Sequence, residues 1–482
     1  MKKLLFSLMV VSLLLPASTR ATNTVTVLKL PKNVTTDSNA FITTWETTTN
    51  NEDITIPTTG TGYNYNVDWG DGTISTAQTG DASHTYNAMG TYIVGITGDF
   101  PRIDFSNTDA DNRTKIKSIE QWGDIAWTSM SAAFYGCENL TINAADAPNL
   151  SNVIDMSYMF FRATGLDGDL STWNTANVTN MKSMFNGATS FNGNVSTWNV
   201  SNVTNMWSMF FDATSFNQDL STWNVGKVTR MRVMFNGATS FNGDVSTWNV
   251  SNVTDVGAMF EGATSFNQDL GAWDVSSVTN MSRMFKETTS FNGDVSTWNV
   301  SNVTNMQATF EGATSFNQDL GAWDISYVTE MSRMFTDVTL SISNYDNTLI
   351  GWSTLSTGET AIPTGITLDA SNCKYSQEAA RNTLINSYSW TINDAGLDTS
   401  LGVDDYQLSG LTIYPNPSVN TIYLRGAIDK LQQITIYSIL GQSELILNKN
   451  FKEININSLK EGIHFINLIS KEGKKTVKFI KE

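Results

Sequence analysis

Apolar residues between residues 130 and 340 return to equivalent positions every 25 residues, with polar residues between them. Phenylalanine, tryptophan and methionine each form a column at this spacing. The columns run from Phe160 to Phe335, from Trp173 to Trp323 and from Met156 to Met331, with Val256 filling one gap. A fixed period in this range is typical of repeat proteins, because a single unit cannot bury its apolar face alone. The pattern therefore predicts a stack of units with these columns as its core.

Within one unit, the pattern predicts a short strand, a turn and one helical turn. Trp198 and Val200 lie two residues apart, so both are expected to point inward from a strand. Met206, Met209 and Phe210 follow the i, i+3, i+4 spacing of a helical face. A glycine follows in most units, as expected where a helix ends in a left-handed residue. Stacked units would pair these strands in parallel, and core packing is favoured over a cofactor site for the Met and aromatic columns.

Two strings carry the repeat, V-T-N-M-x-x-M-F and F-N-x-D-x-S-T-W-N-V. They resemble the BspA-like leucine-rich-repeat surface proteins, in a variant with Met-Phe turns and Trp strands. The resemblance covers roughly residues 116–396, and Trp and Val take the place of the usual leucines. It implies a leucine-rich-repeat-like solenoid and a role in adhesion at the cell surface.

The segment before the repeats is rich in Thr, Val and Asn and alternates as strands do. Its strings YNYNVDWGDGTIS and HTYNAMGTYIVGITG resemble a polycystic-kidney-disease-type β-sandwich, which implies a spacer. Asp68 and Asp71 fall in the tight turn of this segment. Capping of the turn backbone is the favoured role of these carboxylates, and calcium binding is the alternative.

The charge changes sign toward the C-terminus. The whole chain carries a net charge of −17, whereas residues 411–482 hold ten Lys and Arg against six Asp and Glu. The string LTIYPNPSVNTIYLRG and the lysine-rich last strand resemble the type A C-terminal sorting domain of type IX secretion. This resemblance implies a Gram-negative exporter of the Bacteroidetes kind, passage across the outer membrane by the type IX machinery, and later removal of the domain. The alternative is a small β-sandwich that stays in the mature protein.

These features give a fold class that is mainly β with short helices, a solenoid flanked by two β-sandwich domains. Lys2 and Lys3, an apolar run and small residues ending near Ala21 predict a secretory signal peptide. The mature chain has no other segment that is long and apolar enough to cross a bilayer. The expected parts are a signal peptide over 1–21, a β-sandwich-like domain over 22–105, a solenoid with caps over 106–396, a linker over 397–410 and a sorting domain over 411–482.

Composition and motifs exclude several functions. The acidic balance, with a pI near 4.5, argues against a nucleic-acid partner, which demands a basic surface. His84 and His464 are the only histidines, and neither shares a domain with a cysteine, so a nucleophilic catalytic system is not expected. No metal-ligand or phosphate-loop motif occurs. We therefore expect no enzyme activity, no cofactor and no metal. Cys137 and Cys373 lie at opposite ends of the stack and are expected to stay unpaired, because a disulfide needs Cα atoms within about 7 Å.

The candidate binding face consists of the outward positions on either side of the buried tryptophans. Repeat proteins use extended faces of this kind for binding, and the expected ligand is an unidentified extracellular protein or glycan. The alternative is a polar face that only confers solubility. The candidate residues are Thr197, Asn199, Thr222, Asn224, Thr247, Asn249, Asp274, Thr297, Asn299 and Asp324.

Two further polar columns are expected to serve the fold. An aspartate column is expected to cap turns, with cation binding as the weaker alternative, and an asparagine column to hydrogen-bond along the stack. The columns run from Asp219 to Asp319 and from Asn192 to Asn317. The leading hypothesis is a secreted or surface-attached adhesin-like protein. The alternatives are a structural spacer or matrix protein and, third, an extracellular hydrolase that uses two carboxylates.

Overall fold

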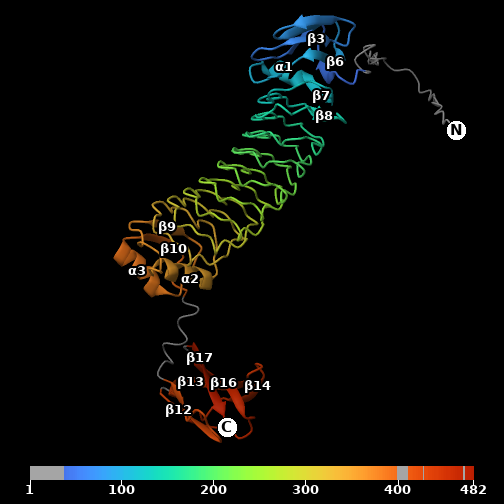
Figure 1. Cartoon of the computed structure of the whole chain (residues 1–482). Helices are drawn as coiled ribbons and strands as arrows, with labels where there is room; N and C mark the ends of the chain where they lie inside the picture. The colour runs from blue at the N-terminus through green and yellow to red at the C-terminus, as the bar shows by residue number, and fades with distance from the viewer. Residues whose placement is uncertain (1–36, 399–410, 427, 471–472) are drawn as a thin grey trace, which may run out of the picture.

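The computed structural model describes residues 37–398, 411–426, 428–470 and 473–482. The expected signal peptide and nearly all of the expected linker lie outside these residues. The chain is mainly β with few helices, 25% strand and 7% helix. Figure 1 shows a β-rich N-terminal region, a long stack of coils, a cap with two helices and a separate β-rich C-terminal region.

The N-terminal region contains a six-stranded sheet in the order β4-β3-β6-β1-β7-β8 and a two-stranded sheet of β2 and β5. β7 pairs with β1 antiparallel and with β8 parallel, so this sheet continues past residue 105 into the first coil. The elements are β1 (Phe41–Thr47), β2 (Glu52–Ile56), β3 (Asn64–Asp68), β4 (Ile74–Gln78), β5 (Ala82–Tyr86), β6 (Gly90–Asp99), α1 (Ala110–Lys115), β7 (Ile116–Gln121) and β8 (Thr141–Ile142).

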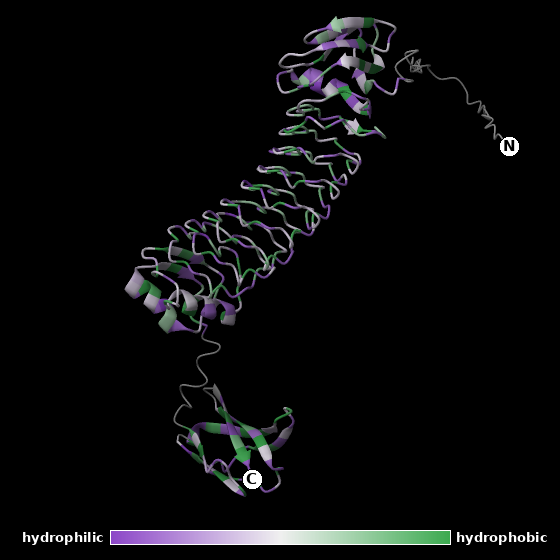
Figure 2. Cartoon of the chain, in the orientation of Figure 1, coloured by the Kyte–Doolittle hydropathy of each residue, from purple (hydrophilic) through white to green (hydrophobic). Residues whose placement is uncertain are grey.

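Each 25-residue unit forms one coil, and the expected interior of the stack is confirmed. The rings of Phe210 and Phe235 stack at 5.6 Å between centroids, and those of Trp223 and Trp248 stack at 6.3 Å. The indole Nε1 of Trp248 donates to the carbonyl of Leu220 at 3.0 Å, so its one polar atom is satisfied inside the core. Among the described residues, buried apolar side chains form one continuous cluster from the N-terminal sheet through the whole stack. Figure 2 shows hydrophobic and hydrophilic residues alternating along the coils.

The helical turn expected after each methionine does not form. In the unit of Met206, alternate backbone amides donate to the next coil: Met206 N to Arg230 O at 2.9 Å and Phe210 N to Met234 O at 2.9 Å. Ser208, between them, has a φ of 59°, and the equivalent residue of every unit is also left-handed. An α-helix requires right-handed φ throughout and amides that bond within the helix. The prediction is wrong because the same apolar spacing also suits a turn in which a left-handed residue interrupts right-handed ones. The amides of such a turn can bond the carbonyls of the next coil.

The strand expected at Trp198 and Val200 does not form either. The segment lies between two turns, although the expected alternation is confirmed, with Trp198 and Val200 buried and Asn199 exposed. Parallel pairing between units occurs elsewhere, as single bridges one position before the methionine column, where Asn205 pairs with Arg230 of the next unit. Successive coils are therefore joined by single parallel β-bridges rather than by a continuous β-sheet.

The asparagine column forms the expected hydrogen-bonded ladder. The amide N–H of Asn242 donates to Oδ1 of Asn217 at 2.8 Å, and Asn267 N donates to Asn242 Oδ1 at 2.9 Å. The same contact repeats up to Asn317, which accepts from Ser341 N at the start of the C-terminal cap. Each side chain therefore fixes the backbone of the following coil.

The C-terminal cap covers the apolar end of the last coil. Trp352 of α2 stacks on Phe335 at 6.4 Å, and its Nε1 donates to Leu320 O at 3.0 Å, as the tryptophans of the repeats do. Both cysteines are buried and unpaired as expected, and burial raises the pKa of the Cys137 and Cys373 thiols. The elements are α2 (Ile342–Trp352), β9 (Thr367–Ala370), α3 (Glu378–Tyr388) and β10 (Thr391–Asp394).

The C-terminal region has its own core. Its buried apolar residues form a cluster from Leu411 to Phe479 that shares no member with the core of the coil stack. Two sheets surround it, in the orders β11-β12-β15 and β14-β13-β16-β17. The strands are β11 (Thr412–Tyr414), β12 (Thr421–Arg425), β13 (Leu431–Ser438), β14 (Ser443–Leu447), β15 (Glu453–Asn455), β16 (Gly462–Ser470) and β17 (Gly473–Lys481), with a 3-10 helix over Ile428–Lys430.

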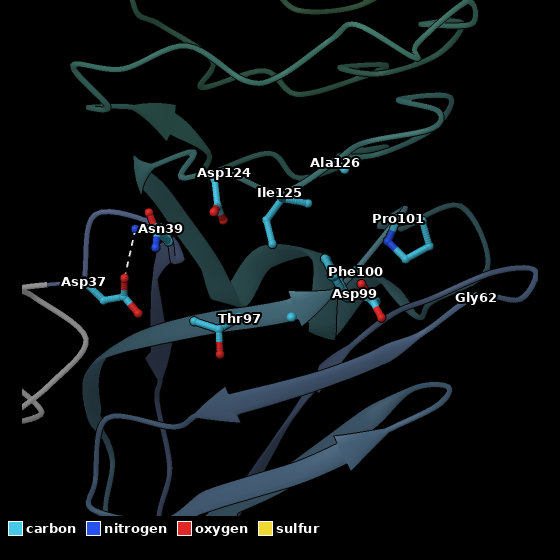
Figure 3. A pocket seen from close by; sticks show the side chains of 11 residues that line it. Asp37, Asn39, Gly62, Thr97, Asp99, Phe100, Pro101, Asp124, Ile125 and Ala126 are labelled. Carbon is cyan, nitrogen blue, oxygen red and sulfur yellow. Dashed lines mark hydrogen bonds between the residues drawn. The ribbon is translucent and has the colours of Figure 1, made fainter.

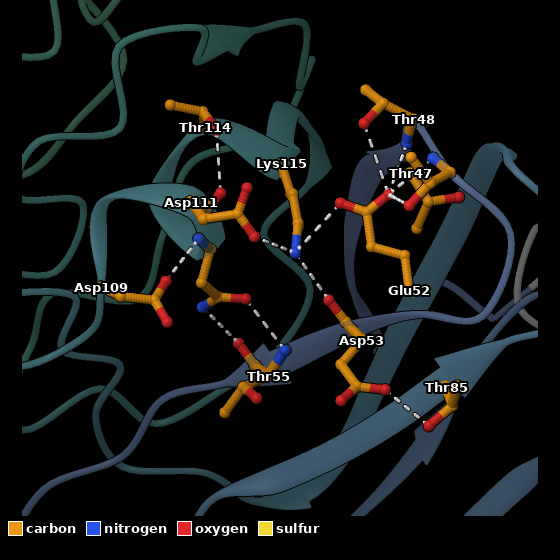
Figure 4. A network of polar contacts seen from close by, with 12 residues as sticks. Thr47, Thr48, Glu52, Asp53, Thr55, Thr85, Asp109, Asp111, Thr114 and Lys115 are labelled. Atoms are coloured by element: carbon orange, nitrogen blue, oxygen red, sulfur yellow. Dashed lines mark hydrogen bonds and ion pairs between the residues drawn. The ribbon is translucent and has the colours of Figure 1, made fainter.

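A buried lysine ties the N-terminal sheets to the start of the coil stack (Figure 4). The Lys115 ammonium at the end of α1 contacts Glu52 Oε1 at 3.2 Å, Asp111 Oδ2 at 2.5 Å and the carbonyl of Asp53 at 2.9 Å. Burial raises the pKa of Glu52, but the amides of Thr48 and Thr49 and the ammonium outweigh burial and hold that pKa at about 2.

Replacing Glu52 with Gln is expected to make folding less sensitive to acid. Because the folded-state pKa of Glu52 is depressed, its contribution is present above the ordinary pKa of 4.5 and is lost as pH falls toward about 2. E52Q should lower the free energy of unfolding at pH 7 by about 1–3 kcal/mol and flatten its fall between pH 4.5 and 3. Urea unfolding at these three pH values measures both effects. D53N is the matched control, because the Asp53 carboxylate bonds Thr85 instead of Lys115. An unchanged slope in E52Q would contradict the assignment.

Candidate functional site

The expected binding residues form two exposed rows along the coils. The threonines lie in the turn before each buried tryptophan, and the Asn and Asp residues directly follow the tryptophan and precede the next turn. In the first row, each threonine hydroxyl donates to a carbonyl of the preceding coil, as Thr197 does to Ser171 O at 2.6 Å. Thr222, Thr247 and Thr297 repeat this contact. The threonine donors are therefore already used in holding coils together.

The second row caps the turns that follow the tryptophans. Oδ1 of Asn199 accepts the amide of Ser201 at 3.1 Å, and Asp274 accepts that of Ser276 at 3.0 Å. All of these residues are exposed except Asp324, which is half-buried and also accepts the Ser326 hydroxyl. The same cap is made by Asn224, Asn249, Asn299 and Asp324. An open hollow of about 520 Å³ lies on this face around Thr197, Asn199 and Asn224. We call the two rows the consensus face.

The aspartate column caps turns as expected. Oδ1 of Asp219 accepts the amide of Ser221 at 2.8 Å, and the other members of the column repeat this contact. The hydrogen bonds from Ser296 lower the pKa of Asp294. In the part of the chain that the structure describes, no three His, Cys, Asp or Glu side chains are grouped so that they would hold a metal ion.

The turn carboxylates of the N-terminal region also cap their own backbone. Asp68 accepts the amide of Gly70 at 3.0 Å, and Asp71 accepts that of Thr73 at 2.9 Å. His84 Nε2 lies 2.8 Å from the second oxygen of Asp71, so this histidine packs against the turn. These contacts match the favoured interpretation of the two carboxylates.

A second hollow, of about 520 Å³, opens where the N-terminal sheet meets the first coil (Figure 3). Asp37, Asp99 and Asp124 line it together with Phe100 and Ile125. Asp37 accepts the amide of Asn39 at 2.9 Å, so at least one of these carboxylates serves the local backbone.

One position of the Met-to-Phe turn was not singled out from the sequence, although its larger side chains Trp207, Arg232 and Gln307 are exposed. The position after the methionine column differs in nearly every coil, whereas the stack-forming columns hardly change. Its residues are Ser157, Lys182, Trp207, Arg232, Gly257, Ser282, Gln307 and Ser332. Variation between units was the available signal, because a position that the stack does not need is free to carry function.

The comparisons identify the two main parts of the chain. Residues 128–247 and 234–352 match the family described as "Mycoplasma protein of unknown function, DUF285", a span just under half of the chain. Residues 412–482 match the "Secretion system C-terminal sorting domain". No curated protein matches the chain. Both matches fall on the segments where the resemblances were found.

The protein is therefore an exported one, located at the cell surface or secreted, and its C-terminal domain implies handling by the type IX secretion system. Among the described residues, no helix has the length and apolar character needed to cross a bilayer.

Proposed function

We propose that this protein is an adhesin-like binding protein of the cell surface, without enzyme activity, that engages an extracellular protein or glycan through its coil stack. The observation that carries the proposal is that one chain combines a sorting domain with a long stack of coils, in which equivalent residues of successive coils form exposed rows. Repeat proteins bind extended partners through such faces. In this proposal the stack is a leucine-rich-repeat-like solenoid, and the N-terminal sheets are a β-sandwich spacer of the polycystic-kidney-disease type.

The hydrogen bonding of the carboxylates and histidines supports a role without catalysis. The repeated aspartates serve turn caps, and an acid–base pair for hydrolysis would need one distinct pair. Both histidines lie against a carboxylate, His84 against Asp71 and His464 against Glu444 at 2.7 Å. A structural spacer remains the second candidate. The stacked phenylalanine rings and the asparagine hydrogen bonds between successive coils would suit a rigid rod.

An array of glycans and matrix proteins, probed with the purified exported protein, tests the binding function. Specific binding to at least one member is expected, whereas a spacer would bind none. A triple replacement of Asn199, Asn224 and Asn249 by Asp then tests the consensus face. It removes three amide donors but retains the turn caps, because Asp274 and Asp324 make the same cap. Loss of binding with an unchanged melting temperature would locate the site on this face, and unchanged binding would locate it elsewhere.

A further inference from the structure

The outward side of the Met-to-Phe turns carries a local cluster of cations and aromatic rings. The Lys182 ammonium lies 4.6 Å from the ring centroid of Trp207 and 5.2 Å from that of Tyr158. Trp207 is 38% exposed, although tryptophan is an aromatic residue that proteins usually bury. In the other coils this position holds Ser, Lys, Arg, Gly or Gln and never an aromatic residue, so the indole is not part of the repeat's own packing.

Next to the indole lies a hollow of about 280 Å³, which we call the Trp207 hollow. Lys182 covers the indole from the preceding coil, and the hollow opens toward the two following coils. It is lined by Trp207, Thr229, Arg230, Arg232, Thr254 and Asp255. Its volume is close to the lower end of the range of small-molecule sites, roughly 300 Å³, and suits a ligand of one or two rings.

The hydrogen bonding between coils is interrupted at this hollow. In neighbouring units a threonine amide donates to the threonine carbonyl one coil earlier, as Thr229 N does to Thr204 O and Thr279 N to Thr254 O. Within the described residues, the equivalent bond from Thr254 N to Thr229 O does not form, and the bridge between Arg230 and Asp255 is also missing from the ladder. The amide of Thr254 and the carbonyl of Thr229 are therefore left for another partner.

The sequence gives a reason for the interruption. Arg230 occupies the column in which Asn180, Asn205 and Asn280 stand, and those asparagines cap the amide two residues later. An arginine has no acceptor atom, so it cannot make this cap. Gly257 is the one glycine at the position after the methionine column, and a Cβ there would come within 2.9 Å of Asp255 Oδ1, 3.0 Å of Asn280 Nδ2 and 3.1 Å of Arg232 Nη1. Arg230 therefore makes no cap to the amide two residues later, and Gly257 places no side chain beside Arg232.

The charges in the hollow favour an anionic ligand. The Arg230 side chain is exposed and makes no ion pair or hydrogen bond with any described residue, and Arg232 has one long contact, 3.4 Å from Nη1 to Asp255 Oδ2. Guanidinium groups bind carboxylates with paired, directional hydrogen bonds. Two such groups beside an exposed indole stand out in a chain with a net charge of −17.

From this arrangement we propose that the Trp207 hollow binds an acidic sugar residue. The pyranose ring lies against the indole, its carboxylate faces Arg230 and Arg232, and its hydroxyls bond Thr229 O and Thr254 N. An acidic peptide fits less well, because protein partners need larger surfaces with an apolar centre. Trp207 is the only exposed large apolar side chain among the hollow's residues. This inference rests on the proposed binding function and names its ligand class.

The test is binding of the exported protein to uronic and sialic acid oligosaccharides, each paired with its carboxyl-reduced counterpart. Preference for at least one acidic member over its counterpart is expected. W207S and R230N install residues found in other coils, and each should weaken that binding about tenfold. W207S removes the ring surface against which the sugar lies, and R230N removes roughly one charge-assisted contact. G257S should weaken it as well, because its side chain would crowd Asp255, Asn280 and Arg232 and shift the two side chains that line the hollow, Asp255 and Arg232. K227N is the matched control, since Lys227 does not line the hollow and its ammonium donates to Asn202 Oδ1 instead. The change removes one positive charge and installs the asparagine that most other units carry at this position.

Three outcomes would overturn the proposal. They are equal binding of the acidic and carboxyl-reduced sugars, binding that survives W207S and R230N, and equally strong binding of poly-glutamate, which would indicate an acidic-peptide or unspecific charge site. If an array ligand binds normally to W207S, the proposed adhesin-like function stands and only this site fails. If no array member binds, both proposals fail.

Discussion

Deleting residues 411–482 is expected to abolish delivery of the protein to the cell surface while leaving residues 37–398 folded. The deleted segment is the one that matches the secretion sorting domain. Its core, from Leu411 to Phe479, shares no residue with the core of the coil stack, so its removal exposes no apolar surface of the stack. The truncated chain should accumulate inside the outer membrane, because the signal peptide expected over 1–21 still directs it out of the cytoplasm.

Cell fractionation and surface protease accessibility in a bacterium with type IX secretion measure this effect. The full chain carrying W207S is the control, since that change leaves the sorting domain intact and should reach the surface normally. The purified truncated protein should keep the melting temperature of the parent stack. Surface delivery of the truncated chain at the parent level would contradict the role of this domain, and a folded chain that remains inside would support it.

The core of the stack was predictable, but its backbone was not. A column such as Phe210, Phe235 and Phe260 needs only a fixed period, and burial follows from the period alone. The choice between a helical turn and a turn interrupted by a left-handed residue depends on where each amide finds its acceptor. Val233 takes a φ of 52° although β-branched residues disfavour it, because its amide pairs with Gly257 O of the next coil. No local pattern reveals a partner 24 residues away.

The same reason limits the prediction of the N-terminal region. The strings around Asp68 and Asp71 indicated strands and a tight turn, and both are present. The pairing of β7 with β1 joins segments more than 70 residues apart, so the sequence did not indicate that this sheet runs into the first coil.

The candidate site was predicted only in outline. Alternation with the buried tryptophans correctly placed Thr197 and Asn199 outside. It did not indicate that the Thr197 hydroxyl bonds the preceding coil or that the Asn199 oxygen caps a turn, because those contacts depend on the exact path of the coil. Trp207 was not singled out from the sequence, because it lies outside the tryptophan column, at a position that varies between units.

Replacing Phe235 with Ala is expected to lower the free energy of unfolding by about 3–5 kcal/mol, the usual cost of removing a buried aromatic ring. Phe235 is fully buried, and its ring lies 5.6 Å from Phe210, 4.0 Å from Phe241 and 5.6 Å from Phe260. The lost ring therefore removes contacts to both neighbouring coils at the middle of the stack.

Because each coil contacts only its neighbours, the damage should also divide the stack. Calorimetry of F235A should show two transitions in place of one, and limited proteolysis should cut first near residue 235. F211N is the matched control: Phe211 is half-buried and neighbouring units carry Asn186 and Asn236 at this position, so a change of about 1 kcal/mol or less is expected. A single transition in F235A at the parent temperature would show that the ring column does not couple one coil to the next.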